Sequence, residues 1–139
     1  LYGGAGLFTA PILKAVGDKG EVHLIESDER AIKDASKIFH KYSNVTLYLG
    51  RVEKILPLVG SIDTILLDPP RSGAGELVVS QMIEKKPKMI VYISCDPASL
   101  ARDSKLLIDG GYKLEDIIGI DLFPMTHHIE CVAKFNLIK

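Results

Sequence analysis

The chain has 139 residues, 47% of them hydrophobic, and a formal net charge of −1; this composition is typical of one folded globular domain and excludes a disordered chain. The near-zero charge excludes a global basic field, so binding of nucleic acid would need a local patch or further regions to contact phosphates. Two cysteines are too few for a disulfide scaffold, so we expect a reduced, cytoplasmic setting, and no apolar stretch approaches the roughly 20 residues that span a bilayer.

The chain opens on a glycine turn. Gly3-Gly4-Ala5-Gly6 is typical of the turn that follows a strand, and almost none of that strand precedes it. We therefore expect a fragment of a longer protein in which the first strand of the sheet is largely missing. The apolar spacing of Leu7–Val16 predicts a helix, in which Pro11 is tolerable only near the first turn.

The segments that follow alternate between strand and helix patterns. Ser27 is the expected N-cap of the second helix, and Asp96 is expected to cap a helix whose first position is Pro97. The strand at 62–67 is apolar enough to be buried on both faces. Helices are expected at residues 7–16, 28–42, 52–58, from the loop after Asp68 to about 85, and 97–108; strands are expected at 21–26, 45–49, 62–67, 89–94, 112–121 and 129–136.

The order of these elements predicts the fold. Strands that alternate with helices form a parallel sheet covered on both faces. The last two strands, 112–121 and 129–136, have no helix between them and should pair as an antiparallel hairpin with a long connection. The fold class is therefore α/β, and it resembles the Rossmann-like class I S-adenosylmethionine methyltransferases, which have a mostly parallel sheet closed by an antiparallel C-terminal hairpin.

Three chemically useful side chains are expected at one edge of this sheet. Asp68 and Cys95 each follow a parallel strand at its carboxyl end, where ligands bind in open α/β sheets. The last strand runs in the opposite direction, so its beginning, where Glu130 lies, reaches the same edge. Asp68, Cys95 and Glu130 should therefore converge.

A second group of residues favours a nucleoside cofactor. The glycine turn lets the backbone approach a ligand, and Glu26 ends the next strand, where an acid can accept hydrogen bonds from ribose hydroxyls. The alternative is an ordinary tight turn beside a solvated glutamate. The glycines do not follow the G-x-G-x-x-G spacing, which argues against NAD.

The residues around the thiol leave two interpretations open. Cys95 precedes a helix start, which favours the thiolate, whereas the neighbouring Asp96 opposes it; the alternative is an inert, buried cysteine. Arg71, after Asp68-Pro69-Pro70, is a candidate contact for phosphate or carboxylate, and its alternative is a surface ion pair. Cys131 points to the face opposite Glu130 and is expected to be structural.

Four motifs stand out along the chain: Leu1-Tyr2-Gly3-Gly4-Ala5-Gly6-Leu7-Phe8-Thr9, Asp68-Pro69-Pro70-Arg71-Ser72-Gly73, Tyr92-Ile93-Ser94-Cys95-Asp96-Pro97 and Phe123-Pro124-Met125-Thr126-His127-His128-Ile129-Glu130. Together they resemble the RNA 5-methyluridine methyltransferases, the uracil-C5 enzymes of tRNA and large-subunit rRNA. They occur in the family's order and cover nearly the whole chain. His127 and His128 in the last of them are interpreted as polar loop residues, and no metal ligand set is expected.

The resemblance implies that residues 1–139 are a catalytic domain with a defined chemistry. Cys95 would add to C6 of uracil and make C5 nucleophilic, and Glu130 would then remove the C5 proton. Asp68 would lie beside both the cofactor and the base. The expected contacts of S-adenosylmethionine are Tyr2, Gly4, Gly6, Leu7, Glu26 and Asp68.

The resemblance also implies partners. RNA, either tRNA or rRNA, would be bound mainly through regions absent from this chain, with Arg71 as the expected contact within it. Loss of the central first strand would leave two neighbouring strands without a shared ladder and expose an edge to self-association. Two alternatives remain: an amino-group nucleic-acid methyltransferase, which needs no cysteine nucleophile, and a non-catalytic domain that keeps the fold.

Overall fold

The computed structural model describes residues 1–122, 125 and 129–138. Within them the chain forms two compact units, Leu1–Val59 and Gly60–Lys139, which are called here the first and the second unit. The strands form two hydrogen-bonded sheets, one of two strands in the first unit and one of four strands in the second. The predicted alternation of helices and strands is confirmed, while the strands of the expected sheet divide between these two units.

The first unit is built on a parallel pair of strands. β1 and β2 pair in register from Val22 opposite Val45 to Glu26 opposite Leu49. Apolar side chains of α1, β1 and α2 are packed into one cluster that includes Leu13, Leu24 and Phe39. The elements of this unit are α1 (Thr9–Val16), β1 (Val22–Glu26), α2 (Glu29–Phe39), β2 (Val45–Leu49), α3 (Val52–Ile55) and the 3₁₀-helix η1 (Leu56–Leu58).

Two helix starts in the first unit differ from the prediction. The prediction of Ser27 as N-cap is wrong, because the Asp28 side chain accepts hydrogen bonds from the backbone N–H groups of Arg30 and Ala31. α1 begins at Thr9 instead of Leu7, because the turn continues through Gly6, whose φ is 96°. Leu7 therefore lies outside the helix, with 80% of its surface exposed.

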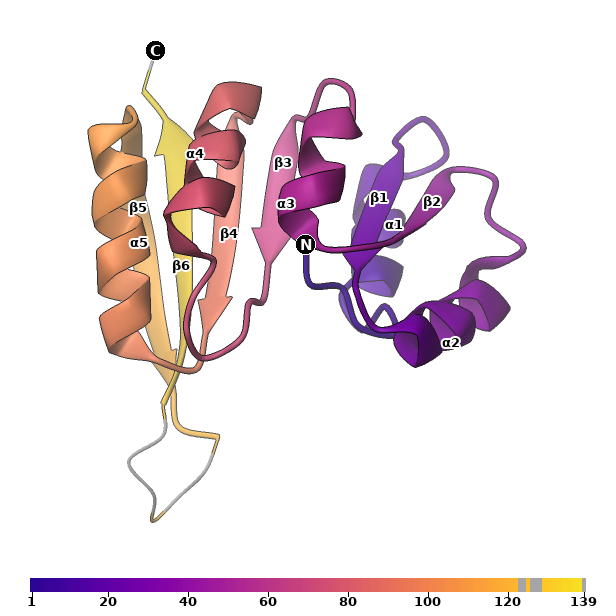
Figure 1. The fold of residues 1–139 in the computed structure, drawn as a ribbon, viewed down its shortest axis with the longest axis horizontal. Helices are drawn as coiled ribbons and strands as arrows, with labels where there is room; N and C mark the ends of the chain where they lie inside the picture. The colour runs from indigo at the N-terminus through magenta and orange to yellow at the C-terminus, as the bar shows by residue number, and fades with distance from the viewer. Residues whose placement is uncertain (123–124, 126–128, 139) are drawn as a thin grey trace. The chain divides into compact units, whose positions relative to one another are not determined.

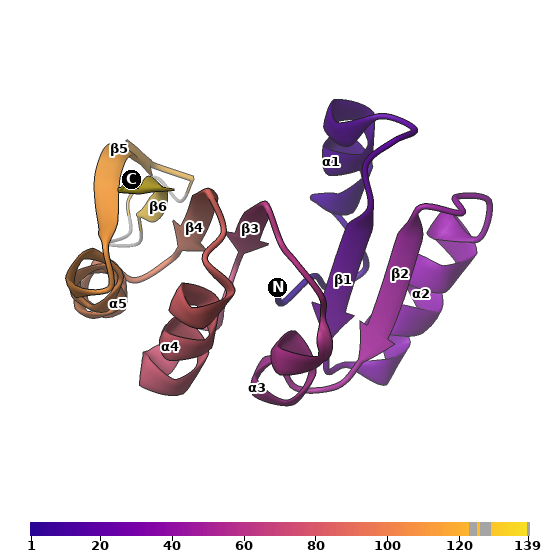
Figure 2. The same ribbon diagram turned by 90° about the horizontal axis from the view of Figure 1, so that it is seen from above.

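The second unit is a mixed sheet with two helices. Its strand order is β3-β4-β6-β5, with β3 parallel to β4 and the other neighbours antiparallel, which confirms the predicted C-terminal hairpin. α4 and α5 lie side by side over one face of this sheet (Figures 1 and 2). The elements are β3 (Thr64–Leu67), α4 (Gly75–Lys85), β4 (Met89–Ser94), α5 (Pro97–Asp109), β5 (Tyr112–Ile120) and β6 (Glu130–Leu137).

The core of the second unit lies between the helices and the sheet. Leu67, Ile90 and Phe135 from three neighbouring strands are fully buried, as is Leu107 from α5. The prediction that β3 is apolar and buried on both faces is wrong, because its side chains alternate between buried and partly or fully exposed. β3 also begins at Thr64, later than predicted.

Candidate active site

The glycine turn is tied to the end of β1. The N–H of Gly3 donates to the carbonyl oxygen of Ile25 at 3.0 Å, and the N–H of Gly4 donates to Oε2 of Glu26 at 2.9 Å. Gly6 adopts a φ of 96°, and a Cβ added there would lie 2.3 Å from Cε2 of Phe39. Only glycine therefore fits at Gly6, since both the backbone conformation and the packing exclude a side chain.

Glu26 is held as an anion beside this turn. Its Oε1 accepts hydrogen bonds from the N–H groups of Ser27 (2.6 Å) and Asp28 (2.8 Å), while Oε2 accepts from Gly4. Partial burial acts to raise the pKa of Glu26, but the backbone donors of Asp28, Gly4 and Ser27 together outweigh it and lower the pKa below its ordinary value. The carboxylate stays charged at neutral pH and can accept further hydrogen bonds from a hydroxylated ligand.

The space beside Gly4 is open. A Cβ added at Gly4 would meet no atom within 4 Å, although its φ of 52° lies in the left-handed region. Tyr2 also has a positive φ, 57°, which is uncommon for a bulky residue. Of the predicted cofactor contacts, Tyr2, Gly4, Gly6, Leu7 and Glu26 lie in the first unit and Asp68 lies in the second.

The second unit brings the three predicted catalytic side chains to one edge of its sheet. Leu67 of β3 pairs with Tyr92 of β4, so Asp68 lies just beyond the end of β3. Ser94 pairs with Cys131, so the next residue of the chain, Cys95, reaches the level of Glu130, the first residue of β6. The strand register therefore places the three residues at the same end of the sheet, and the convergence of their side chains stays a prediction.

The environment of Asp68 differs from that of an ordinary surface carboxylate. Asp68 directly follows β3, and its residue surface is exposed. The protein around the carboxyl group nevertheless removes part of its hydration, and this desolvation raises the pKa of Asp68 above its usual range.

Cys95 lies between β4 and the cap of α5. It is a free, half-buried thiol. The predicted cap is confirmed, because Asp96 accepts a hydrogen bond from the N–H of Ser99 at 2.8 Å. This bond, with smaller contributions from the charges of Arg71 and Arg102, lowers the pKa of Asp96. The residue next to the Cys95 thiol is therefore a carboxylate, Asp96, whose charged form is stabilised in part by the positive charge of Arg71.

The two neighbours Glu130 and Cys131 occupy different surroundings. Cys131 is buried, whereas Glu130 is half-buried, as expected for successive residues of a strand. Burial, with a smaller contribution from the charge of Glu130, raises the pKa of the Cys131 thiol. A thiol with a raised pKa is a poor nucleophile at neutral pH, which fits the structural role predicted for Cys131.

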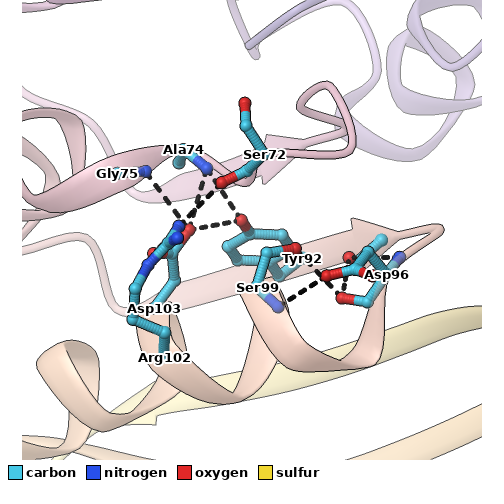
Figure 3. A network of polar contacts seen from close by, with 9 residues as sticks. Ser72, Ala74, Gly75, Tyr92, Asp96, Ser99, Arg102 and Asp103 are labelled. Carbon is cyan, nitrogen blue, oxygen red and sulfur yellow. Dashed lines mark hydrogen bonds and ion pairs between the residues drawn. The ribbon is translucent and has the colours of Figure 1, made fainter.

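A buried polar cluster that was missed in the sequence lies next to this edge. Asp103 of α5 is fully buried. Its carboxylate accepts hydrogen bonds from the hydroxyl of Tyr92, from the guanidinium of Arg102 and from the backbone N–H of Ala74, in the loop between β3 and α4 (Figure 3). The signal was present in the pattern, because Asp103 lies between Leu100 and Leu107 on the buried stripe of α5, where a charged residue requires partners.

Other predicted features of the site fall outside the described residues or remain predictions. His127 and His128, interpreted as polar loop residues, are not among the described residues. Among residues 1–122, 125 and 129–138, no group of three or more His, Cys, Asp or Glu side chains is arranged to hold a metal ion. Within the same residues, no helix has both the length and the apolar character needed to cross a bilayer.

Comparison with known proteins identifies a family and several relatives. Residues 34–136 match the family described as tRNA (Uracil-5-)-methyltransferase. An RNA methyltransferase of Streptomyces avermitilis, itself uncharacterised, is 47% identical over 135 residues, which cover 96% of this chain and 31% of that protein. The 23S rRNA (uracil(1939)-C(5))-methyltransferase RlmD of Shewanella sp. strain ANA-3 is 43% identical, and the match covers 100% of this chain and 31% of that protein.

A solved structure extends this similarity to three dimensions. The crystal structure of Pyrococcus abyssi tRNA (uracil-54, C5)-methyltransferase in complex with S-adenosyl-L-homocysteine aligns with a TM-score of 0.78 and 32% identity. The alignment covers 96% of this chain and 32% of that chain. The matched length is therefore about a third of each relative, and it includes both units described above.

Proposed function

Because the chain belongs to the tRNA (uracil-5-)-methyltransferase family, we propose that it carries the catalytic machinery for S-adenosylmethionine-dependent methylation of uracil C5 in RNA. The observation that supports this most directly is the strand register, which brings Cys95 level with Glu130 beside the end of β3, where Asp68 lies. Residues 1–139 form the catalytic domain in this proposal.

The chemistry assigned to Cys95 and Glu130 follows from the weak nucleophilicity of uracil C5. The Cys95 thiolate forms a bond to C6, and the electron pair of the C5–C6 double bond moves to C5 and the C4 carbonyl. S-adenosylmethionine would supply the methyl group to C5; its S–CH3 bond would break, and S-adenosylhomocysteine would leave. Glu130 then takes the proton from C5, the double bond re-forms, and the S–C6 bond breaks to release the thiolate. The target uridine has to leave its stack to reach this edge.

The residues of the first unit fit the cofactor. The glycine turn leaves open space at Gly4, and Glu26 is an anion that can accept hydrogen bonds from ribose hydroxyls. Tyr2, Gly6 and Leu7 complete the proposed contacts in this unit, and Asp68 is the proposed contact in the second unit. Asp68 would lie beside both the cofactor and the target base.

RNA is the proposed macromolecular partner. Arg71 follows Asp68 by three residues in the loop after β3, and its positive charge contributes to the lowered pKa of Asp96. A phosphate beside Arg71 would form charge-assisted hydrogen bonds with the guanidinium. We further propose that regions outside this chain supply most RNA contacts, that tRNA or rRNA is the substrate, and that the protein works in the cytoplasm.

Trapping with 5-fluorouridine RNA tests the reaction. Fluorine at C5 cannot leave as a proton, so the covalent adduct between Cys95 and C6 should persist and appear as a protein–RNA band that requires S-adenosylmethionine. Cys95→Ser should abolish the band, while Cys131→Ala, which removes the buried thiol, should retain it. Methylation that survives in Cys95→Ser would contradict the proposal and favour an amino-group methyltransferase.

Two further measurements test the other assignments. Calorimetric titration with S-adenosylmethionine distinguishes a catalytic domain from a non-catalytic domain that keeps the fold, since only the former requires the cofactor. Self-association through a sheet edge stays a prediction that sedimentation at several protein concentrations would test. A constant monomer mass would contradict it.

A further inference from the structure

The loop between β3 and α4 combines prolines with glycines in the left-handed region and is held partly by side chains of other elements. It begins at Asp68, contains two prolines and turns at Gly73, whose φ is 81°; α4 then begins at Gly75, whose φ is 80°. Within the loop, the N–H of Gly73 donates to the carbonyl oxygen of Pro70 at 2.8 Å. The groups at its far end, from Ser72 onward, are held by α5 and β4.

Asp103 is the centre of those contacts. Its Oδ2 accepts hydrogen bonds from the N–H of Ala74 at 2.8 Å, from the N–H of Gly75 at 3.3 Å and from the hydroxyl of Tyr92 at 2.6 Å. Its Oδ1 accepts from Nε and Nη2 of Arg102 at 3.0 and 2.8 Å. Burial of a carboxylate costs free energy unless hydrogen-bond donors surround it, so the packed position of Asp103 depends on these donors.

Arg102 and Tyr92 extend the anchor to more of the loop. Nη2 of Arg102 donates to the carbonyl oxygen of Ser72 at 2.8 Å, and the hydroxyl of Tyr92 also accepts from the N–H of Ala74 at 3.0 Å. Figure 3 shows these side chains directed at the loop backbone from α5 and β4. A Cβ added at Gly73 would lie 2.6 Å from Nη2 of Arg102 and 2.7 Å from Oδ2 of Asp103, so the loop lies directly on the pair.

The anchor joins the loop to the two elements that flank the thiol. Tyr92 belongs to β4, the strand that Cys95 follows, and Asp103 belongs to α5, the helix that Asp96 caps. The loop carries Asp68 at its start and Arg71 in its middle. A displacement of the loop would therefore move both of these side chains relative to Cys95.

We propose that Asp103 is a positioning residue that, together with Tyr92 and Arg102, holds the loop Asp68–Ala74 and the start of α4 against β4 and α5. It thereby places Asp68 and Arg71 relative to Cys95. The inference deepens the proposed uracil-C5 chemistry and rests on it for its catalytic consequence. Small displacements of reacting groups are known to cost large factors in rate.

The first test does not depend on activity. Amide hydrogen exchange is measured in the parent protein, in Tyr92→Phe, in Asp103→Asn and in the control Asp109→Asn, which changes an exposed carboxylate of the same helix paired with Lys105. We expect exchange at Ala74 to accelerate about fivefold or more in both Tyr92→Phe and Asp103→Asn, and exchange at Gly75 to accelerate in Asp103→Asn. Tyr92→Phe removes one acceptor of the Ala74 N–H, and Asp103→Asn replaces one carboxylate oxygen by an amide nitrogen that cannot accept. Exchange across β4 and in Asp109→Asn should stay at the parent level.

The second test reads the catalytic consequence in the natural full-length protein. At a temperature where circular dichroism shows Tyr92→Phe to be fully folded, the rate of adduct formation with 5-fluorouridine RNA should fall about tenfold or more. The control Asp109→Asn, measured with the same RNA, should form the adduct at the parent rate, because its exposed carboxylate pairs with Lys105 and lies outside the anchor. A purely structural role would leave the rate per folded molecule unchanged.

The outcomes separate this inference from the proposed function. Parent-like exchange at Ala74 and Gly75 in both variants overturns the anchor, whatever the activity of the parent. Local acceleration of exchange with an unchanged rate of adduct formation overturns the positioning role. A parent that forms no adduct overturns the proposed function and with it the catalytic consequence, while the exchange measurement still decides whether the anchor exists.

Discussion

Replacement of Gly6 by alanine should destabilise the first unit more than replacement of Gly4, although both glycines lie in the same turn. Both have positive φ values, 96° and 52°, and a residue with a Cβ is strained there by roughly 1–2 kcal/mol. The environments differ: a Cβ at Gly6 would lie 2.3 Å from Cε2 and 2.9 Å from Cζ of Phe39, whereas a Cβ at Gly4 meets nothing within 4 Å.

The difference in packing sets the magnitude. Phe39 is a buried ring in the core of the first unit, so it cannot move aside without disturbing its neighbours. Overpacking of this kind costs about 1–3 kcal/mol. Gly6→Ala should therefore lower the free energy of unfolding by about 2–5 kcal/mol in total, and Gly4→Ala by about 1–2 kcal/mol.

Urea unfolding followed by circular dichroism measures the contrast. At a slope of about 2 kcal/mol/M, a loss of about 3 kcal/mol lowers the midpoint by about 1.5 M. Gly60→Ala is the matched control, since its added Cβ would meet nothing within 4 Å and its φ is not in the left-handed region. If Gly6→Ala and Gly4→Ala unfold at the same urea concentration, the ring of Phe39 does not exclude a side chain at position 6, and the prediction is wrong.

Three further predictions concern a cap, a cofactor contact and a titration. Asp28→Ala should lower the free energy of unfolding in urea by about 1 kcal/mol, because it removes the N-cap of α2. An equal or larger loss in Ser27→Ala would contradict this and favour Ser27 as the cap. Glu26→Gln should weaken S-adenosylmethionine binding about tenfold or more in calorimetry, since the charged acceptor is lost; unchanged affinity would exclude Glu26 as a ligand. Burial raises the pKa of Tyr112 from 10.0 to about 12, so above pH 10 the unfolded state binds fewer protons at this residue. Its contribution to the free energy of unfolding should fall by up to about 2 kcal/mol towards pH 12, measured as the difference in pH dependence between the parent and Tyr112→Phe.

The sequence determined the order of elements and the edge of the sheet at which the candidate catalytic residues lie. Apolar periodicity located the strands, and the topology rules for parallel strands then placed Asp68 and Cys95 at carboxyl ends. Because no helix separates the last two strands, they are expected to pair antiparallel. The last strand therefore begins at the edge where the parallel strands end, and Glu130 lies there. These inferences need only chain order, so no side-chain detail was required.

Tertiary structure alone decided where polar side chains find their partners. Ser27 and Asp28 are both good caps by residue type, and only the backbone geometry selects Asp28. The position of Asp103 on the apolar stripe of α5 indicates that it needs partners, but only the packed fold shows that these include Ala74 and Tyr92. The physical reason is that a hydrogen bond needs donor and acceptor within about 3 Å, and residues distant in sequence reach that separation only when the packed fold brings them together.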